Sequence, residues 1–262
     1  MNKLWLTLVL LAAAVIASPG ALASDNPFVG TWKLNPARSH YAGWTYTMKQ
    51  KPDGTIHLVD GSVAYDFKLD GKDYPTITDR TTSWTKTGDS TYSTTLKAGG
   101  KVLSHSERVL SADGKTMTVT ITGTHQDGSS FRVVETFQKT AGGAGLDGTW
   151  KDTRTVVHNQ DTMVISSTMP GTMRVEYGAS KTVAEGKLDG SPIKVTGPIA
   201  PPGATGTWKM PDAHTLDYTH AIQDKITSQG SEKISADGKT LTDTNWDPAV
   251  PKEKAVVVWE KQ

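Results

Sequence analysis

Apolar and polar residues alternate along most of this chain, in short runs that Asp-Gly pairs interrupt. The alternation is clearest where Met117, Val119 and Ile121 share one face and the threonines between them share the other. A period of two is typical of strands with one buried face. Asp-Gly suits tight hairpin turns, because both residues tolerate a positive φ. No long window shows the apolar period of a helix, so the pattern predicts an all-β chain of hairpin-linked strands.

The sequence also contains a duplicated unit. The segment SADGKTMT that begins at Ser111 recurs as SADGKTLT at Ser235, 124 positions later, and GTWK at Gly30 recurs at Gly148, 118 positions later. Other matching segments follow in the same order, with small drifts in offset that indicate loop insertions. A third GTWK, around Trp208, aligns with SWTK around Trp84 in the middle of the first copy. The chain therefore has two repeats and not three.

These repeats predict two domains, at residues 28–139 and 146–262, joined by a flexible Gly-rich linker at residues 140–145. Roughly eight to ten strands in each domain would leave long bare edges unless the sheet closes on itself. We therefore expect two tandem, small, antiparallel up-and-down β-barrels. Each repeat is expected to fold alone, with its own G-x-W strand.

The beginning of the chain is typical of a secretory signal peptide, residues 1–23. Lys3 supplies a positive charge, an apolar run follows from Leu4 to Ile16, and Ala21-Leu22-Ala23 forms an A-x-A cleavage site. The apolar run is too short for a stable membrane span, so no membrane insertion is expected. The chain has no cysteine, which excludes a lipobox and a disulfide framework. A periplasmic or secreted protein is predicted.

Charge and motif spacing exclude several function classes. The formal net charge is +1, and it falls to zero once the segment that carries Lys3 is removed, so no nucleic-acid footprint exists. Asp113-Gly114-Lys115-Thr116 lacks the first glycine of a phosphate-binding loop, because Val109 stands there. His214 and His220 would lie roughly 20 Å apart along a strand, too far to share a metal. No cofactor, metal or catalytic constellation is predicted, and we expect the protein not to be an enzyme.

The opening strands resemble those of a known superfamily. Residues 28–34, FVGTWKL, and residues 146–150, LDGTW, resemble the first strand of calycin barrels, which include the lipocalins and the fatty-acid-binding proteins. The whole chain is most similar to secreted bacterial lipocalin-like domains. The resemblance implies barrels with internal cavities and a small lipophilic ligand, and it implies that Trp32 and Trp150 fill the closed ends.

Three classes of function remain open on this basis. The first is a secreted or periplasmic lipocalin-like protein that binds a small, mainly apolar ligand. The alternative is a structural or protein-interaction module of the cell envelope with filled barrels and no ligand. An enzyme with a site assembled from distant strands is the third, although no residue nominates one.

The repeat predicts which side chains face inward. In the first repeat the inward set is Val63, Tyr65, Phe67 and Leu69, and its counterparts are Thr182, Ala184, Gly186 and Leu188. The large aromatic side chains of Tyr65 and Phe67 thus have only Ala184 and Gly186 as counterparts. The second barrel is expected to be roomier, or to be repacked by flexible methionines, namely Met163, Met169 and Met173.

Arg108 is the main candidate for binding a charged group. The inward set of the second repeat, marked by Ile226 and Ile234, maps onto Val102, Ser104, Ser106, Arg108 and Leu110. Fatty-acid-binding proteins hold carboxylates with interior arginines, so the resemblance makes Arg108 a candidate carboxylate contact. Two other interpretations stay open: a structural pair with Glu135, or an Arg108 that faces solvent.

The second barrel is expected to have the opposite charge preference. Glu232 stands at the position of Arg108, and Asp243 and Asn245 replace Val119 and Ile121. Any charged ligand there should therefore be a cation. The predicted ligand-binding residues of the two barrels are Arg108, Tyr65, Phe67, Trp84, Trp208 and Glu232.

Overall fold

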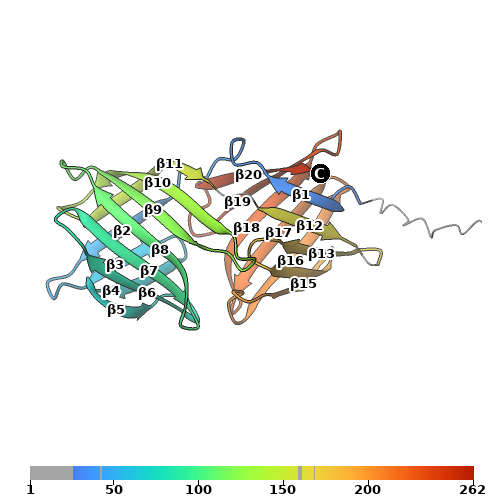
Figure 1. The fold of residues 1–262 in the computed structure, drawn as a ribbon. Coiled ribbons are helices and arrows are strands. Elements are labelled where there is room, and N and C mark those ends of the chain that lie inside the picture. The colour runs from blue at the N-terminus through green and yellow to red at the C-terminus, as the bar shows by residue number, and fades with distance from the viewer. Residues whose placement is uncertain (1–25, 42, 159–160, 168) are drawn as a thin grey trace, which may run out of the picture.

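The computed structural model describes residues 26–262, apart from residues 42, 159–160 and 168 (Figure 1). Its elements are all strands, and they form two antiparallel sheets of ten strands each. One sheet is a closed barrel and the other is nearly closed. The predicted all-β class and the pair of barrels are confirmed. The predicted signal peptide, residues 1–23, lies outside the described residues.

The first barrel is the nearly closed sheet, and its strands follow each other directly along the chain. They are β2 (Thr45–Gln50), β3 (Ile56–Asp60), β4 (Val63–Phe67), β5 (Asp70–Pro75), β6 (Arg80–Lys86), β7 (Thr91–Ala98), β8 (Lys101–Leu110), β9 (Thr116–Thr124), β10 (Ser130–Ala141) and β11 (Gly148–Val157).

The second barrel is the closed sheet, and it combines the first strand of the chain with the last nine. Its strands are β1 (Gly30–Leu34), β12 (Thr162–Ser166), β13 (Thr172–Tyr177), β14 (Thr182–Lys187), β15 (Asp189–Thr196), β16 (Ala204–Asp212), β17 (Thr215–Ile222), β18 (Lys225–Ile234), β19 (Thr240–Trp246) and β20 (Lys254–Lys261).

The two repeats exchange their first strands. Figure 1 shows β1, in blue, among the strands of the C-terminal half, and β11 beside β10. Trp32 on β1 lies opposite Met163 of β12 and Lys261 of β20. Trp150 on β11 pairs with β10 and with β2, opposite Tyr46. The prediction that residues 28–139 and 146–262 form separate barrels is therefore wrong for the G-x-W strand of each repeat.

The segment predicted as a linker is the reason for this exchange. β10 runs to Ala141 and β11 begins at Gly148, so residues 140–145 belong to a hairpin within one barrel. A short connection normally makes antiparallel neighbours, and these two strands cannot separate into different barrels across it. The Lys139 ammonium donates to the carbonyls of Gly143 and Gly145 at 2.7 and 2.8 Å, which holds the turn in place. The flexible linker was a wrong prediction.

Trp32 and Trp150 are fully buried and hydrogen-bonded, as their predicted structural role requires. Each indole Nε1 donates to the carbonyl four residues earlier, Phe28 at 2.8 Å and Leu146 at 2.9 Å. A buried indole whose one donor is satisfied contributes its large apolar area without a desolvation penalty. Phe28, Trp32 and Leu34 belong to the core of the second barrel, which confirms that β1 is part of it.

The SADGKT segments form hairpin turns, as predicted. The hydroxyl of Ser111 donates to Asp113 at 2.6 Å and accepts from the backbone N–H of Thr116 at 2.9 Å. Gly114 has a φ of 67°, which glycine adopts without strain. The second copy repeats these bonds, because the Ser235 hydroxyl donates to Asp237 at 2.5 Å.

The nearly closed barrel differs from the closed one at a single seam, the unpaired gap between β4 and β5. In the second barrel β14 pairs with β15, for example Glu185 with Lys194. At the equivalent place in the first barrel, β4 and β5 are the unpaired ends of the sheet. Pro75 stands at the position of Lys194, and proline has no N–H to donate across a ladder. The first barrel therefore has a break in its wall beside β4.

The loops at one end of each barrel pack against loops of the other barrel. The backbone N–H of Gln126 donates to the carbonyl of Ala179 at 2.9 Å. In the related contact, the backbone N–H of Ser62 donates to Asp247 at 2.7 Å. The first contact joins the β9–β10 loop to the β13–β14 loop, and the second joins the β3–β4 loop to the β19–β20 loop. The two kinds of loop thus change barrels between the two contacts, as a two-fold arrangement of the repeats requires. The corresponding ends of the two barrels therefore face each other.

Candidate functional site

The first barrel encloses two adjoining hollows, with volumes of about 320 and 550 Å³. Tyr65, Trp84 and Arg108, three of the predicted ligand-binding residues, line both of them. The larger hollow also reaches Thr76 and Ile77, on the other side of the seam from β4. The rest of the shared wall combines one carboxyl with apolar side chains, namely Asp60, Val63 and Ile121.

Arg108 points into the barrel, so the solvent-facing interpretation is wrong. Its guanidinium carbon lies 4.3 Å from the centroid of the Trp84 ring, in a cation–π contact. Its Nη1 donates to the hydroxyl of Thr94 on the neighbouring strand. The Phe67 ring supports Trp84 from the other side, with the centroids 4.3 Å apart and the planes 20° apart. Phe67 itself is fully buried and lines neither hollow, so its predicted ligand contact is not available.

Three side chains that line these hollows have a buried nitrogen without a well-aligned hydrogen-bond partner among the described residues. They are Arg108 and Trp84, which line both hollows, and Arg80, which lines the larger one. The Trp84 indole lies near the Tyr65 hydroxyl, and this contact offsets part of the rise that burial causes in the pKa of Tyr65. An unsatisfied buried donor costs free energy. The three nitrogens are themselves out of reach of water, so they mark a polar stretch of wall behind the hollows.

Arg108 does not form a direct ion pair with Glu135 among the described residues, although the two carry opposite charge across β9. Val119 lies between them in register, opposite Arg108 on one side and Glu135 on the other. Burial raises the pKa of Glu135 to about 7, and the nearby Arg108 only partly offsets that rise. Burial likewise raises the pKa of Asp60 to about 6, helped by Asp247. Near neutral pH Glu135 is therefore partly protonated, which leaves Arg108 incompletely neutralised.

The second barrel encloses a smaller cavity of about 240 Å³. Trp208 and Glu232 line it, as predicted. It is smaller because methionines fill the space of the missing aromatic rings: Met163 and Met173 are buried, and Ile193 occupies the place where a side chain of Gly186 would be. The second barrel is thus repacked and not roomier.

The strand register of the second barrel repeats that of the first, with two acids and no cation at these positions. Glu232 lies opposite Asp243, and Asp243 lies opposite Val257, where the first barrel has Arg108, Val119 and Glu135. The predicted replacement of an inward cation by inward acids is confirmed. Burial raises the pKa of both Glu232 and Asp243, and the proximity of Asp243 raises that of Glu232 further.

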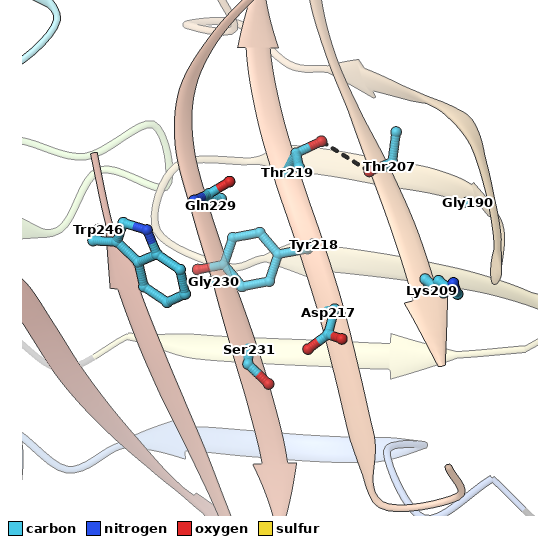
Figure 2. A pocket seen from close by; sticks show the side chains of 10 residues that line it. All are labelled: Gly190, Thr207, Lys209, Asp217, Tyr218, Thr219, Gln229, Gly230, Ser231 and Trp246. Atoms are coloured by element: carbon cyan, nitrogen blue, oxygen red, sulfur yellow. Dashed lines mark hydrogen bonds between the residues drawn. The ribbon is translucent and has the colours of Figure 1, made fainter. Parts of the chain in front are cut away.

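Asp243 has donors for both of its oxygens, and Glu232 has none among the residues that the structure describes. The Tyr218 hydroxyl donates to Oδ1 of Asp243 at 2.9 Å, and Nδ2 of Asn245 donates to Oδ2 at 2.8 Å. Figure 2 shows the Tyr218 ring extending from β17 toward Gly230 on β18. Glycine is needed there, because a Cβ at residue 230 would lie 2.6 Å from the Tyr218 hydroxyl oxygen.

The close approach of the Tyr218 ring to Gly230 predicts the effect of a substitution at residue 230. We expect Gly230→Ala to lower the free energy of unfolding by about 1–3 kcal/mol, since overpacking displaces the Tyr218 ring from Asp243. Thermal or denaturant unfolding measures it. The variant Tyr218→Leu removes the ring, which approaches a Cβ at residue 230 with both its oxygen and its Cζ, so Gly230→Ala should cost less in that background. An equal cost in both backgrounds would mean that the Thr244 carbonyl, 2.8 Å from the added Cβ, opposes the substitution and the ring does not.

Two positions of the predicted inward sets face solvent. Val102 and Ile226 are 44% and 43% exposed, although alternation from Arg108 and Glu232 predicts that they point inward. A bulge between Leu96 and Lys97 breaks the register opposite Val102, and the second barrel has an equivalent break opposite Ile226. One extra residue reverses the face of everything beyond it. Met169, predicted to help fill the second barrel, is 62% exposed in a loop.

A groove on the outer wall of the second barrel has no enclosed space. Figure 2 shows its side chains, with Thr207 and Thr219 hydrogen-bonded at 2.8 Å and Trp246 at one side. Lys209 and Asp217 are exposed, and the ammonium of Lys254 lies 4.3 Å from the Trp246 ring centroid. It is a stretch of solvated wall, and the site residues lie inside the barrels.

Two further kinds of site are absent from the described part of the chain. Within residues 26–262, outside the four undescribed positions, no group of three His, Asp or Glu residues could hold a metal ion. That part of the chain also contains no helix with the length and apolarity to cross a membrane. No protein-family model matches the chain, and no curated protein matches its sequence.

Proposed function

We propose that this chain is a secreted or periplasmic binding protein, lipocalin-like in its architecture, whose first barrel holds a small, mainly apolar ligand with a carboxylate or similar acceptor. The observation that carries the proposal is the Arg108 guanidinium, which lines both hollows of the first barrel and has no ion pair among the described residues. A ligand carboxylate would neutralise it. The apolar side chains around it would contact the remainder of the ligand.

The cavity has room for such a ligand and a route by which it could enter. Its larger hollow measures about 550 Å³ and extends past the seam beside β4. At its outer end Pro201 and Ile222 of the second barrel contribute to the lining. Arg80 fixes that end, because its Nη2 donates to the carbonyl of Ile199 at 2.8 Å. Entry would thus take place near the junction of the two barrels.

Dodecanoate binding to the full chain tests this function. We expect saturable binding by calorimetry, and Arg108→Met should weaken it about 10- to 100-fold, because a hydrogen bond to a charged group contributes about 1.5–3 kcal/mol. The matched control is Arg132→Met, since Arg132 is exposed on the outer face of β10. Equal affinity of wild type and Arg108→Met would exclude Arg108 as the contact.

The alternative is a structural module of the cell envelope without a ligand. The position of Glu135 favours it. Glu135 faces the same hollow as Arg108 and could neutralise it at high pH. In that case Arg108→Met should strongly destabilise the ligand-free protein by leaving a buried carboxyl without its cation. The unfolding midpoint of Arg108→Met, measured beside the dodecanoate titration, separates the two functions.

A further inference from the structure

We propose that the second barrel has its own binding site, for a small organic ammonium cation that carries an apolar or aromatic group. The proposal does not depend on the function of the first barrel. It rests on the cavity between Glu232, Asp243 and the aromatic side chains that enclose them.

The cavity has acids but no cation of its own. Glu232 and Asp243 both line it, and no lysine or arginine in the described part of the chain does. The Glu232 carboxyl lies within the barrel and has no hydrogen bond or ion pair among the described residues. Glu232 is half-buried and lines the cavity, where an ammonium group is the partner that suits a carboxylate best.

The rest of the lining suits the body of such a ligand. Tyr177, Trp208 and Tyr218 offer aromatic rings, and Met173 and Leu216 offer apolar surface. Aromatic faces attract organic cations, most strongly where water is excluded. The volume of about 240 Å³ exceeds the roughly 30 Å³ share of one water several-fold, which admits a ring with a short amine arm.

Asp243 helps to shape the site, but both of its oxygens already accept hydrogen bonds from the protein. Its two oxygens are held by Tyr218 and Asn245 at 2.9 and 2.8 Å, so the orientation of its carboxyl is fixed. Glu232, across the strand pair, is left to contact the ammonium directly. The site is thus preorganised, with one held acid and one available acid.

Binding should be linked to proton release. Burial and Asp243 raise the pKa of Glu232, so in the empty cavity this carboxyl keeps its proton near neutral pH. The other titratable groups that face it are Tyr177, Tyr218 and His220, and burial raises the pKa of both tyrosines and lowers that of His220, which keeps all three neutral. An entering ammonium stabilises the carboxylate, and the proton of Glu232 leaves to solvent.

Calorimetry with benzylammonium on the full chain at pH 7 tests the site. We expect one equivalent to bind, with proton uptake by buffer that appears as a dependence of the heat on buffer ionisation enthalpy. Glu232→Gln should lower the affinity at least tenfold and abolish the proton release. Benzyl alcohol, which has the same ring and no charge, should bind at least tenfold more weakly than benzylammonium.

Two matched variants make the outcome decisive. Glu185→Gln removes an exposed acid from the outer face of β14 in the same barrel and should leave binding unchanged. Arg108→Met should also leave it unchanged, which separates this site from the proposed function of the first barrel. The proposal is overturned if benzylammonium does not bind, if Glu232→Gln binds it as tightly as wild type, or if benzyl alcohol binds equally well.

Discussion

Replacing Trp32 with alanine is expected to destabilise the second barrel, although Trp32 belongs to the first repeat. The Trp32 side chain is fully buried in the core that also contains Met163, Leu241 and Trp259. Truncating a buried tryptophan costs about 3–5 kcal/mol. Hydrogen exchange followed by mass spectrometry should show lost protection in β12–β20 and little change in β2–β10.

The matched variant is Trp150→Ala, which should have the reciprocal effect. Trp150 lies in the core of the first barrel with Tyr46, Met117 and Phe137. Protection should therefore fall in β2–β10 and stay in β12–β20. If Trp32→Ala loosens β2–β10 instead, each repeat closes its own barrel, and the exchanged arrangement of β1 and β11 does not hold in solution.

Glu232→Gln is expected to stabilise the protein, by an amount that increases as the pH rises from about 5 to 8. Native Glu232 keeps its proton at pH values where the same residue in the unfolded chain, with an ordinary pKa of 4.5, has lost it. Unfolding then releases a proton, so the free energy of unfolding of the wild type falls as the pH rises through this window. Below pH 4.5 both states are protonated and the contribution of Glu232 is fully retained.

The size of the effect follows from proton linkage. Each unit of pKa difference corresponds to about 1.4 kcal/mol, so Glu232→Gln should gain on the order of a few kcal/mol at pH 8 and little at pH 5. His220 acts in the opposite direction, because burial lowers its pKa and costs stability as the pH falls. Comparing the variant with wild type at each pH cancels that contribution.

Denaturant unfolding at a series of pH values measures this difference. The control is Glu185→Gln, whose exposed side chain should give the same small change at every pH. A Glu232→Gln variant that is less stable than wild type at pH 8 would show that the carboxylate is ionised and satisfied by a structural partner. Such a result would also remove the basis for proton release on ligand binding.

Several features of the site could be predicted from the sequence because the two repeats complement each other. The strand around Arg108 has no clear alternation of its own, but its counterpart around Glu232 does. Comparing them placed both charges inside the barrels, where the structure has them. The comparison failed at Val102, because a bulge is a property of backbone pairing that side-chain alternation does not encode.

Other site features depend on distances between strands. The passage of Tyr218 over Gly230 to Asp243 joins three strands, and no local pattern contains it. The stack of Phe67 on Trp84, which removes Phe67 from the cavity wall, is of the same kind. Both depend on which side chain reaches farther across the barrel, and this is settled by packing.

The sequence by itself determined the all-β class, the duplication, the Asp-Gly turns and the faces of most strands, because each depends on alternation or on turn residues a few positions apart. Only the tertiary structure decided which barrel receives each G-x-W strand. Gly30 and Gly148 begin nearly identical strands, so either one fits either barrel by its own side chains. The choice follows from the short connection between β10 and β11, which keeps β11 in the first barrel and leaves β1 to close the second.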